Sequence, residues 1–139
     1  MQLILPMAIV VFLTFFVLII MVSSRIYCVQ TKQIKTGYFK TYVNKSDKEI
    51  PDYVVQIGRN FSNLMELPPI FYITCLIFMH LVFVDETTVI LAWVFALTRI
   101  AHTAVHISIN HITARLLIFT INCLALLGMW LQLIGKVYL

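Results

Sequence analysis

Two unbroken runs of 20 uncharged residues, 3–22 and 116–135, constrain this chain more than any other feature of its sequence. A helix of that length measures about 30 Å, which matches the hydrocarbon core of a bilayer. The chain is 61% hydrophobic and only 12% charged, whereas a soluble domain carries about 25% charged residues. A globule of 139 residues cannot bury so much apolar surface. We therefore expect an integral membrane protein surrounded by the lipid bilayer.

The other apolar segments complete a single domain of four membrane helices. We expect an all-α, up-down-up-down four-helix bundle over residues 1–139. The first run is too long for a cleaved signal peptide, and it lacks a basic n-region and a small-residue cleavage site. The predicted helices cover residues 3–24, 52–84, 87–109 and 113–136, with a polar cytoplasmic loop at 25–51.

The basic residues predict how the chain crosses the membrane. Six of the ten Lys and Arg residues lie between Arg25 and Lys48. The connection before the fourth helix holds Arg115, whereas the connection after the second helix holds only the acids Asp85 and Glu86. Basic residues favour cytoplasmic loops, so both termini of this multi-pass protein should lie outside the cytoplasm. The net charge of +4 fits a membrane surface, and no nucleic-acid partner is expected.

Two groups of polar side chains recur at helical spacing. Arg59, Asn63 and Glu66 are four and three residues apart, which places them on one stripe of a helix. Arg59 and Glu66 are about 10.5 Å apart along the axis, too far for an ion pair within one helix. Each therefore needs a partner from elsewhere. The second group, with the same kind of spacing, consists of Arg99, His102 and His106.

Both groups should lie at one membrane depth, because the second helix leaves the cytoplasmic side and the third returns to it. Arg115, at the start of the fourth helix, joins them. The set holds three arginines and one glutamate, a surplus of two positive charges. Arginine binds carboxylates in bidentate fashion. The pattern therefore indicates a site for an anionic ligand near the cytoplasmic face.

Each of these residues, taken alone, also has a purely structural interpretation. Arg59 or Arg115 alone is typical of an interface anchor that extends to lipid headgroups. His102 or His106 alone is typical of a hydrogen bond between helices. A metal site at His102 and His106 would need His111 as its third ligand. His111 is not a clear third ligand and the group lies among arginines, so no metal is expected. Three widely spaced cysteines suggest neither a disulfide framework nor a zinc site: Cys28, Cys75 and Cys123.

The two polar motifs together resemble those of the MAPEG superfamily, the membrane-associated proteins of eicosanoid and glutathione metabolism. The first motif reads RxxxNxxE at residues 59–66 and is followed by proline. The second reads RxAHTxxH at residues 99–106, and Arg115 lies sixteen residues after Arg99. The resemblance covers the whole chain, including the four spans and the polar first loop.

This resemblance implies a homotrimer that holds glutathione between neighbouring subunits near the cytoplasmic face. It implies that Arg115 faces the glutathione thiol and is the catalytic residue. It also implies a basic residue from the first loop, and three candidates are present: Arg25, Lys32 and Lys35. The residues implied to bind glutathione are Arg59, Asn63, Glu66, Arg99, His102 and His106.

Several positions depart from the pattern of the well-studied eicosanoid enzymes. His106 and Pro69 stand where those enzymes carry tyrosines. Leu116 follows the key arginine where some members have serine, and Phe119 replaces a nearby tyrosine. The hydroxyls that tune prostaglandin or leukotriene chemistry are therefore missing. The short chain resembles the bacterial branch of the family, which implies a detoxifying role in a bacterial inner membrane.

Three functional hypotheses follow from these patterns. The first is a glutathione-dependent transferase or peroxidase, whose glutathione thiolate attacks lipophilic small-molecule electrophiles or hydroperoxides. The second is a non-catalytic binding or structural membrane protein of the same fold. The third is a small transporter or proton-conducting bundle that uses Arg99, His102 and Glu66.

Overall fold

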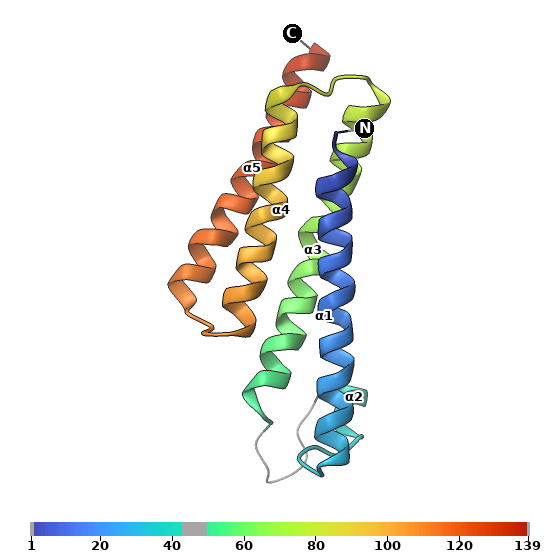
Figure 1. Ribbon diagram of the computed structural model, residues 1–139, viewed down its shortest axis with the longest axis vertical. Helices are drawn as coiled ribbons and strands as arrows, with labels where there is room; N and C mark the ends of the chain where they lie inside the picture. Colours follow the sequence, from blue (N-terminus) through green and yellow to red (C-terminus); the bar gives the residue numbers. More distant parts are fainter. Residues whose placement is uncertain (1, 43–49, 139) are drawn as a thin grey trace.

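The computed structural model describes residues 2–42 and 50–138, and its long helices form an antiparallel bundle with both chain ends at one end (Figure 1). No strand occurs within these described ranges. The predicted all-α, up-and-down four-helix fold is confirmed. The long helices are α1 (Ile4–Gln30), α3 (Asp52–His80), α4 (Glu86–Ile107) and α5 (Ile112–Tyr138), and the short helix α2 covers Tyr38–Thr41.

All four long helices have the length and composition to cross a membrane. Their outward surfaces carry large apolar side chains, which is unfavourable in water and favourable in lipid. The exposed apolar residues include Phe12, Phe16 and Ile19 of α1 and Leu124 and Leu131 of α5. These features are those of an integral, multi-pass membrane protein.

The helices pack as two pairs, α1 with α3 and α4 with α5, and α4 also contacts α1 and α3. The apolar core lies in the half of the bundle that holds the chain ends, and all four long helices contribute to it. Phe71 of α3 and Phe95 of α4 stack there with their ring centroids 4.2 Å apart. Small residues of α4, Ala92 and Ala96, are fully buried and allow close approach of its neighbours.

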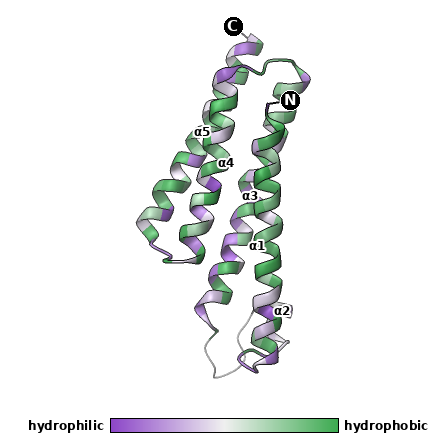
Figure 2. Cartoon of the chain, in the orientation of Figure 1, coloured by the Kyte–Doolittle hydropathy of each residue, from purple (hydrophilic) through white to green (hydrophobic). Residues whose placement is uncertain are grey.

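The opposite half of the bundle is more polar on its inner surface. Figure 2 shows hydrophilic positions of α3 and α4 gathered in the half away from the termini. There α1 and α3 extend beyond the α4–α5 connection (Figure 1). The polar motifs predicted from the sequence lie in this half, because α3 enters the bundle and α4 leaves it at the same end.

The first helix runs to Gln30, past its expected end at residue 24, so Arg25 belongs to α1 and not to a loop. The reason is the apolar residues beyond Arg25: Cys28 is buried against Ile34 and Val54. The helix closes where the backbone N–H groups of Gln33 and Ile34 both donate to the Cys28 carbonyl. The expected loop at 25–51 also contains α2, and its residues 43–49 lie outside the described ranges.

The second predicted helix, 52–84, ends earlier, at His80. Val82 adopts a left-handed backbone conformation with φ of 58°, which a helix cannot include. The backbone N–H of Phe83 then donates to the carbonyl of Phe78 and closes the helix end. Pro68 and Pro69 lie within α3 without ending it.

Candidate functional site

A cavity of about 290 Å³ opens among α3, α4 and α5 in the polar half of the bundle. Its polar lining comes from one residue of each helix, namely Asn63, His102 and Arg115. The remaining lining is apolar and comes from the start of α5: Ile112, Leu116 and Phe119. Three residues predicted from separate parts of the sequence therefore surround one space.

Arg99 lies one turn along α4 from the apolar core and is only 1% exposed. Its guanidinium carbon is 5.4 Å from the Phe95 ring centroid and 5.6 Å from the Phe119 ring centroid. Its Nη1 donates a long hydrogen bond of 3.4 Å to the Asn63 carbonyl oxygen. Its Nε and Nη2 have no hydrogen-bond partner within the described part of the chain. The cation is buried with most of its donors unused.

His102 and His106 project from the same face of α4, and their ring centroids are 5.7 Å apart. The His102 ring also lies 5.9 Å from the Phe119 ring. His106 is fully buried, and neither of its ring nitrogens has a partner among the described residues. Arg115 lies within electrostatic range of both histidines. The second polar motif thus forms one cluster with the arginine of α5.

Arg115 occupies the first turn of α5 and is half-buried at the wall of the cavity. Its Nη1 donates a 2.7 Å hydrogen bond to Oδ1 of Asn110, which precedes α5. Its Nε is buried without a partner among the described residues. The protein therefore holds one N–H group of the guanidinium, and Nε is left unpaired among the described residues.

The first polar motif is divided by the fold. Asn63 lines the cavity, whereas Arg59 and Glu66 are exposed on the surface of α3. Glu66 lies within electrostatic range of Arg99, and Arg59 lies within electrostatic range of His106. The predicted stripe exists, and its two charged members face outward from a single chain.

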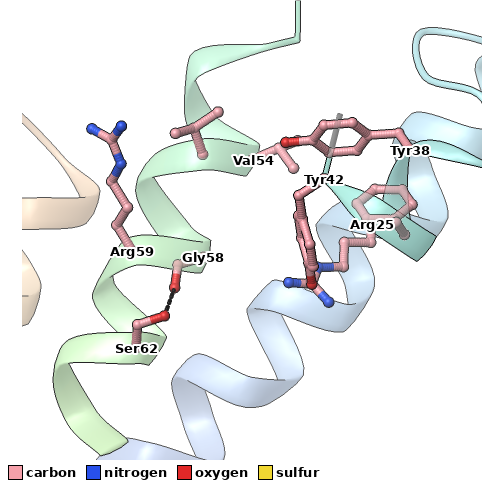
Figure 3. Close-up of a pocket in the computed structure, with 9 residues that line it drawn as sticks. Arg25, Tyr38, Tyr42, Val54, Gly58, Arg59 and Ser62 are labelled. Carbon is pink, nitrogen blue, oxygen red and sulfur yellow. Dashed lines mark hydrogen bonds between the residues drawn. The ribbon is translucent and has the colours of Figure 1, made fainter. Parts of the chain in front are cut away.

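A second cavity, of about 390 Å³, lies between α1, α2 and α3. Arg25 lines it and places its guanidinium 5.4 Å from the Phe39 ring and 5.7 Å from the Tyr42 ring. Arg59 contributes to the same lining, but Figure 3 shows its guanidinium extending away from Tyr42 and Arg25. Of the three predicted basic candidates, Arg25, which lies on α1, lines this cavity together with Arg59. Lys32 and Lys35 are exposed.

Asn60 is a buried polar residue that the sequence analysis did not single out. Its Oδ1 accepts a 3.4 Å hydrogen bond from the Thr103 hydroxyl, and its Nδ2 has no partner among the described residues. A signal was available, because Asn60 follows Val54 and Ile57 on the buried stripe of α3. An amide on an apolar stripe indicates a polar contact between helices.

His111 does not join the cluster formed by His102 and His106. It is exposed, and its Nδ1 accepts a 3.3 Å hydrogen bond from the backbone N–H of Ala114 in the first turn of α5. No group of three His, Cys, Asp or Glu side chains suited to a metal ion occurs within residues 2–42 and 50–138.

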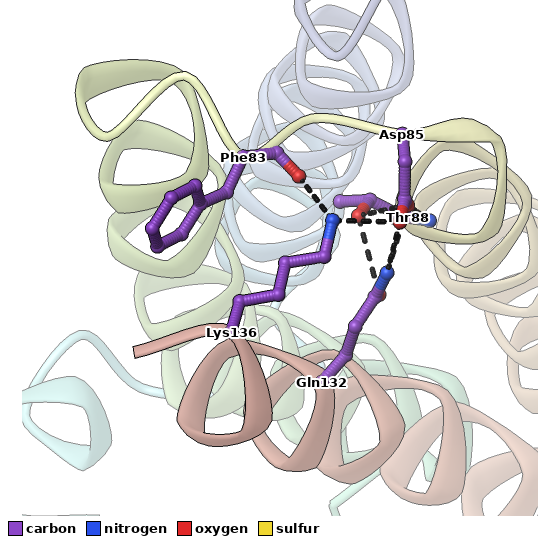
Figure 4. Close-up of polar contacts among 5 residues, drawn as sticks. All are labelled: Phe83, Asp85, Thr88, Gln132 and Lys136. Carbon is purple, nitrogen blue, oxygen red and sulfur yellow. Dashed lines mark hydrogen bonds and ion pairs between the residues drawn. The ribbon is translucent and has the colours of Figure 1, made fainter. Parts of the chain in front are cut away.

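A different polar network, at the end of the bundle that holds the termini, contains a cation whose hydrogen-bond acceptors are supplied by the protein itself (Figure 4). Lys136 Nζ donates to Asp85 Oδ2 at 2.6 Å and to the Phe83 carbonyl oxygen at 2.7 Å. Asp85 is the N-cap of α4 and accepts from the Thr88 backbone N–H at 2.8 Å. Gln132 Nε2 donates to both Asp85 carboxylate oxygens. The unused donors of Arg99 contrast with this arrangement.

Comparison with known proteins identifies the chain at the level of its family. A family model described as the MAPEG family matches residues 3–135. No curated protein and no solved structure matches the chain.

Proposed function

The chain belongs to the MAPEG family, and on that premise we propose that it is a membrane-embedded glutathione-dependent transferase or peroxidase. The observation that carries this proposal is the buried Arg99, whose Nε and Nη2 lack partners among the described residues. Its guanidinium contacts Asn63 and Phe119, which line the cavity together with His102 and Arg115. A buried guanidinium without an acid is costly unless an anion completes it. Glutathione supplies two carboxylates of the kind that arginine binds.

The described residues fit glutathione in the number and kind of their unused donors. Nε and Nη2 of Arg99 and Nε of Arg115 are unpaired among the described residues, and in this proposal the glutathione carboxylates accept from them. Asn63 and His102 line the cavity and would bind the peptide groups or the ammonium of the tripeptide. Arg59 and Glu66, which are exposed on α3, would complete the site at a neighbouring subunit in a homotrimer.

The chemistry of the proposed site follows from its surplus of positive charge. A free thiol has a pKa of about 8.5, so only a few per cent is thiolate at neutral pH. A guanidinium beside the sulfur favours the anion, and a shift of two units corresponds to about 2.7 kcal/mol. Bound glutathione would release its thiol proton to water and supply a sulfur nucleophile for an electrophilic carbon or a peroxide oxygen. The proposed role of Arg115 is to stabilise that thiolate.

The second substrate is proposed to be lipophilic and to arrive from the bilayer. The wall of the cavity beside Arg115 is apolar, and two of its residues, Ile112 and Leu116, are exposed on the outer surface of α5. A membrane-dissolved electrophile or hydroperoxide can reach such a wall without crossing water. We place the site near the cytoplasmic face of a bacterial inner membrane, where detoxification of such compounds is the proposed role.

The decisive experiment is a glutathione titration of the purified protein in detergent. We expect an ultraviolet thiolate signal and a glutathione-dependent rise in Tm. The Arg115→Ala variant should keep its fold and lose the thiolate signal, while Lys40→Ala, an exposed change on α2, should match the wild type. Absence of both thiolate and a Tm shift in the wild type would refute the proposal. Wild-type turnover by Arg115→Ala would refute the role of Arg115.

A second candidate function is a glutathione-binding protein without turnover. The observation in its favour is that none of the six residues lining the cavity carries a hydroxyl group. A Tm shift with no thiolate and no product would favour this alternative. The transporter hypothesis, which uses Arg99, His102 and Glu66, predicts ion or proton flux in liposomes and is tested separately.

A further inference from the structure

Asn110 lies in the connection between α4 and α5, and its backbone and its side chain make different contacts. Asn110 has φ of 48°, in the left-handed region that Asn and Gly adopt more readily than other residues. Its backbone N–H donates to the Val105 carbonyl oxygen at 2.8 Å, which closes the end of α4. The backbone requirement alone would be met by glycine.

The side chain of Asn110 makes a contact that glycine could not make. Its Oδ1 accepts a hydrogen bond from Arg115 Nη1 at 2.7 Å. This distance is at the short end of the range for charge-assisted N–H···O hydrogen bonds. Arg115 lines the cavity, and its buried Nε has no partner within the described ranges. The amide holds the guanidinium through Nη1 at the wall of the cavity and leaves Nε unpaired in the described part of the chain.

The chemical nature of this partner matters as much as its position. An amide oxygen is neutral, so it orients the guanidinium without cancelling its charge. A carboxylate in the same place would hold the group equally well and neutralise it. At the other end of the bundle, the carboxylate of Asp85 pairs with the Lys136 ammonium and neutralises its charge. The partner of Arg115 differs from that partner in being neutral.

From this geometry we infer that Asn110 is a positioning residue, which holds the Arg115 guanidinium at the cavity wall with its charge intact so that it can stabilise a bound thiolate. This inference rests on the proposed function. Asn110 itself does not contact the substrate in this proposal. It acts on the glutathione thiolate through the Arg115 guanidinium.

Two neighbours in the same connection provide matched controls. His111 accepts from the Ala114 backbone N–H, and the Ser108 hydroxyl donates to the Ala104 carbonyl oxygen at 2.6 Å. Neither side chain has a hydrogen bond to the Arg115 guanidinium within the described ranges; the His111 backbone carbonyl accepts from the Arg115 backbone N–H at 3.0 Å, and a change of side chain leaves that helical bond in place. Changing His111 or Ser108 removes a contact from the connection and leaves the guanidinium contact in place.

The test uses the full-length protein and measures thiolate absorbance of bound glutathione as a function of pH. We expect Asn110→Gly, which keeps the left-handed backbone, to raise the apparent thiol pKa by about one unit, or about tenfold less thiolate below that pKa. Glutathione affinity should change less than threefold. Asn110→Asp should keep the contact but reduce thiolate at least as much, because its carboxylate neutralises Arg115. His111→Ala and Ser108→Ala should titrate like the wild type.

The outcomes separate the two proposals. Thiolate formation at the wild-type pKa in both Asn110 variants would overturn the role of Asn110 and leave the proposed function standing. An equal loss in His111→Ala would also overturn it, since the effect would then belong to the connection as a whole. If Asn110→Gly does not fold, Asn110→Asp alone decides. Absence of thiolate in the wild type would instead refute the proposed function.

Discussion

Arg99 is enclosed by aromatic rings and a backbone carbonyl, and no carboxylate pairs with it among the described residues. Cation–π contacts of this kind are worth about 0.5–2 kcal/mol. A buried polar group without a partner costs about 1–3 kcal/mol and more when it is charged. The residue therefore costs stability in the ligand-free protein, and such a cost is typical of binding sites.

We accordingly predict that Arg99→Met raises the Tm of the glutathione-free protein while abolishing the rise that glutathione produces. Methionine fills a similar volume and needs no hydrogen-bond partner, so the gain should be about 1–3 kcal/mol. Thermal unfolding in detergent, with and without glutathione, measures both effects.

Lys136→Met is the matched control, because Lys136 is a cation with its donors satisfied. This variant should lose stability and keep its response to glutathione. A lower Tm for ligand-free Arg99→Met would contradict the prediction, since Arg99 would then contribute to folding and not to binding.

The spacing rules predicted which site residues share a helix face, but not which of their atoms find partners. Arg99, His102 and His106 share the buried face of α4, as their spacing predicts, because helical periodicity alone determines that arrangement. The exposure of Glu66 depends on how separate helices meet, and the Asn110–Arg115 contact depends on the backbone conformation of the α4–α5 connection. Spacing within one helix carries no such information.

At the scale of helices, Asp85 connects α4 to the end of α5 through Lys136 and Gln132. Hydrogen bonds from Lys136 and from Thr88 hold the pKa of the Asp85 carboxyl well below its usual range. A depressed folded-state pKa means that the stabilisation is complete above the unfolded value of about 3.9 and is lost as the pH falls below it. The carboxylate is 42% exposed, so solvent screening keeps the ion pair modest.

We predict that Asp85→Asn lowers stability at pH 7 by up to about 1 kcal/mol, because Asn keeps the N-cap acceptor and removes the charge. The difference from the wild type should shrink as the pH falls from 5 towards 3. Thermal unfolding across that range measures it. Glu86→Gln, an exposed change at the next residue, should show no such convergence, and a constant deficit in Asp85→Asn would argue against the ionic contribution.

The ends of the helices were less predictable from the sequence than their existence. Arg25 suggested the end of the first span, yet the burial of Cys28 against Val54 extends α1 to Gln30. The basic side chain can remain at the surface of a helix that continues past it. The left-handed backbone conformation of Val82, which follows the end of α3, is not indicated by the residue types around it.

At the scale of the whole molecule, the apolar and polar halves of the bundle imply a direction in the membrane. The polar half and α2, which follows α1, lie at the end opposite the termini (Figure 1, Figure 2). Basic residues favour the cytoplasmic side. Exposed positions at the two ends are Lys40 of α2 and Thr87 of α4.

We predict that Thr87→Cys is labelled by a membrane-impermeant maleimide in intact cells, and that Lys40→Cys is labelled only after the cells are opened. The native Cys28 and Cys75 are buried and Cys123 is partly exposed, so the labelling of the wild type, which carries all three, is subtracted as background. The reverse labelling pattern would place the site on the opposite face of the membrane.

The exposed stripe of α3 indicates how the subunits assemble. Arg59, Glu66 and Ile73 recur every seven residues and are all exposed on the single chain. Charged groups within membrane helices almost always face protein or a wet cavity, so this stripe should meet neighbouring subunits. We expect native mass spectrometry to give a trimer, and Ile73→Trp to weaken it and reduce glutathione affinity. Leu124→Trp, on the exposed side of α5, should keep both. A trimer that tolerates Ile73→Trp with unchanged glutathione affinity would place this stripe against lipid, and the two charges of α3 could not then complete the site.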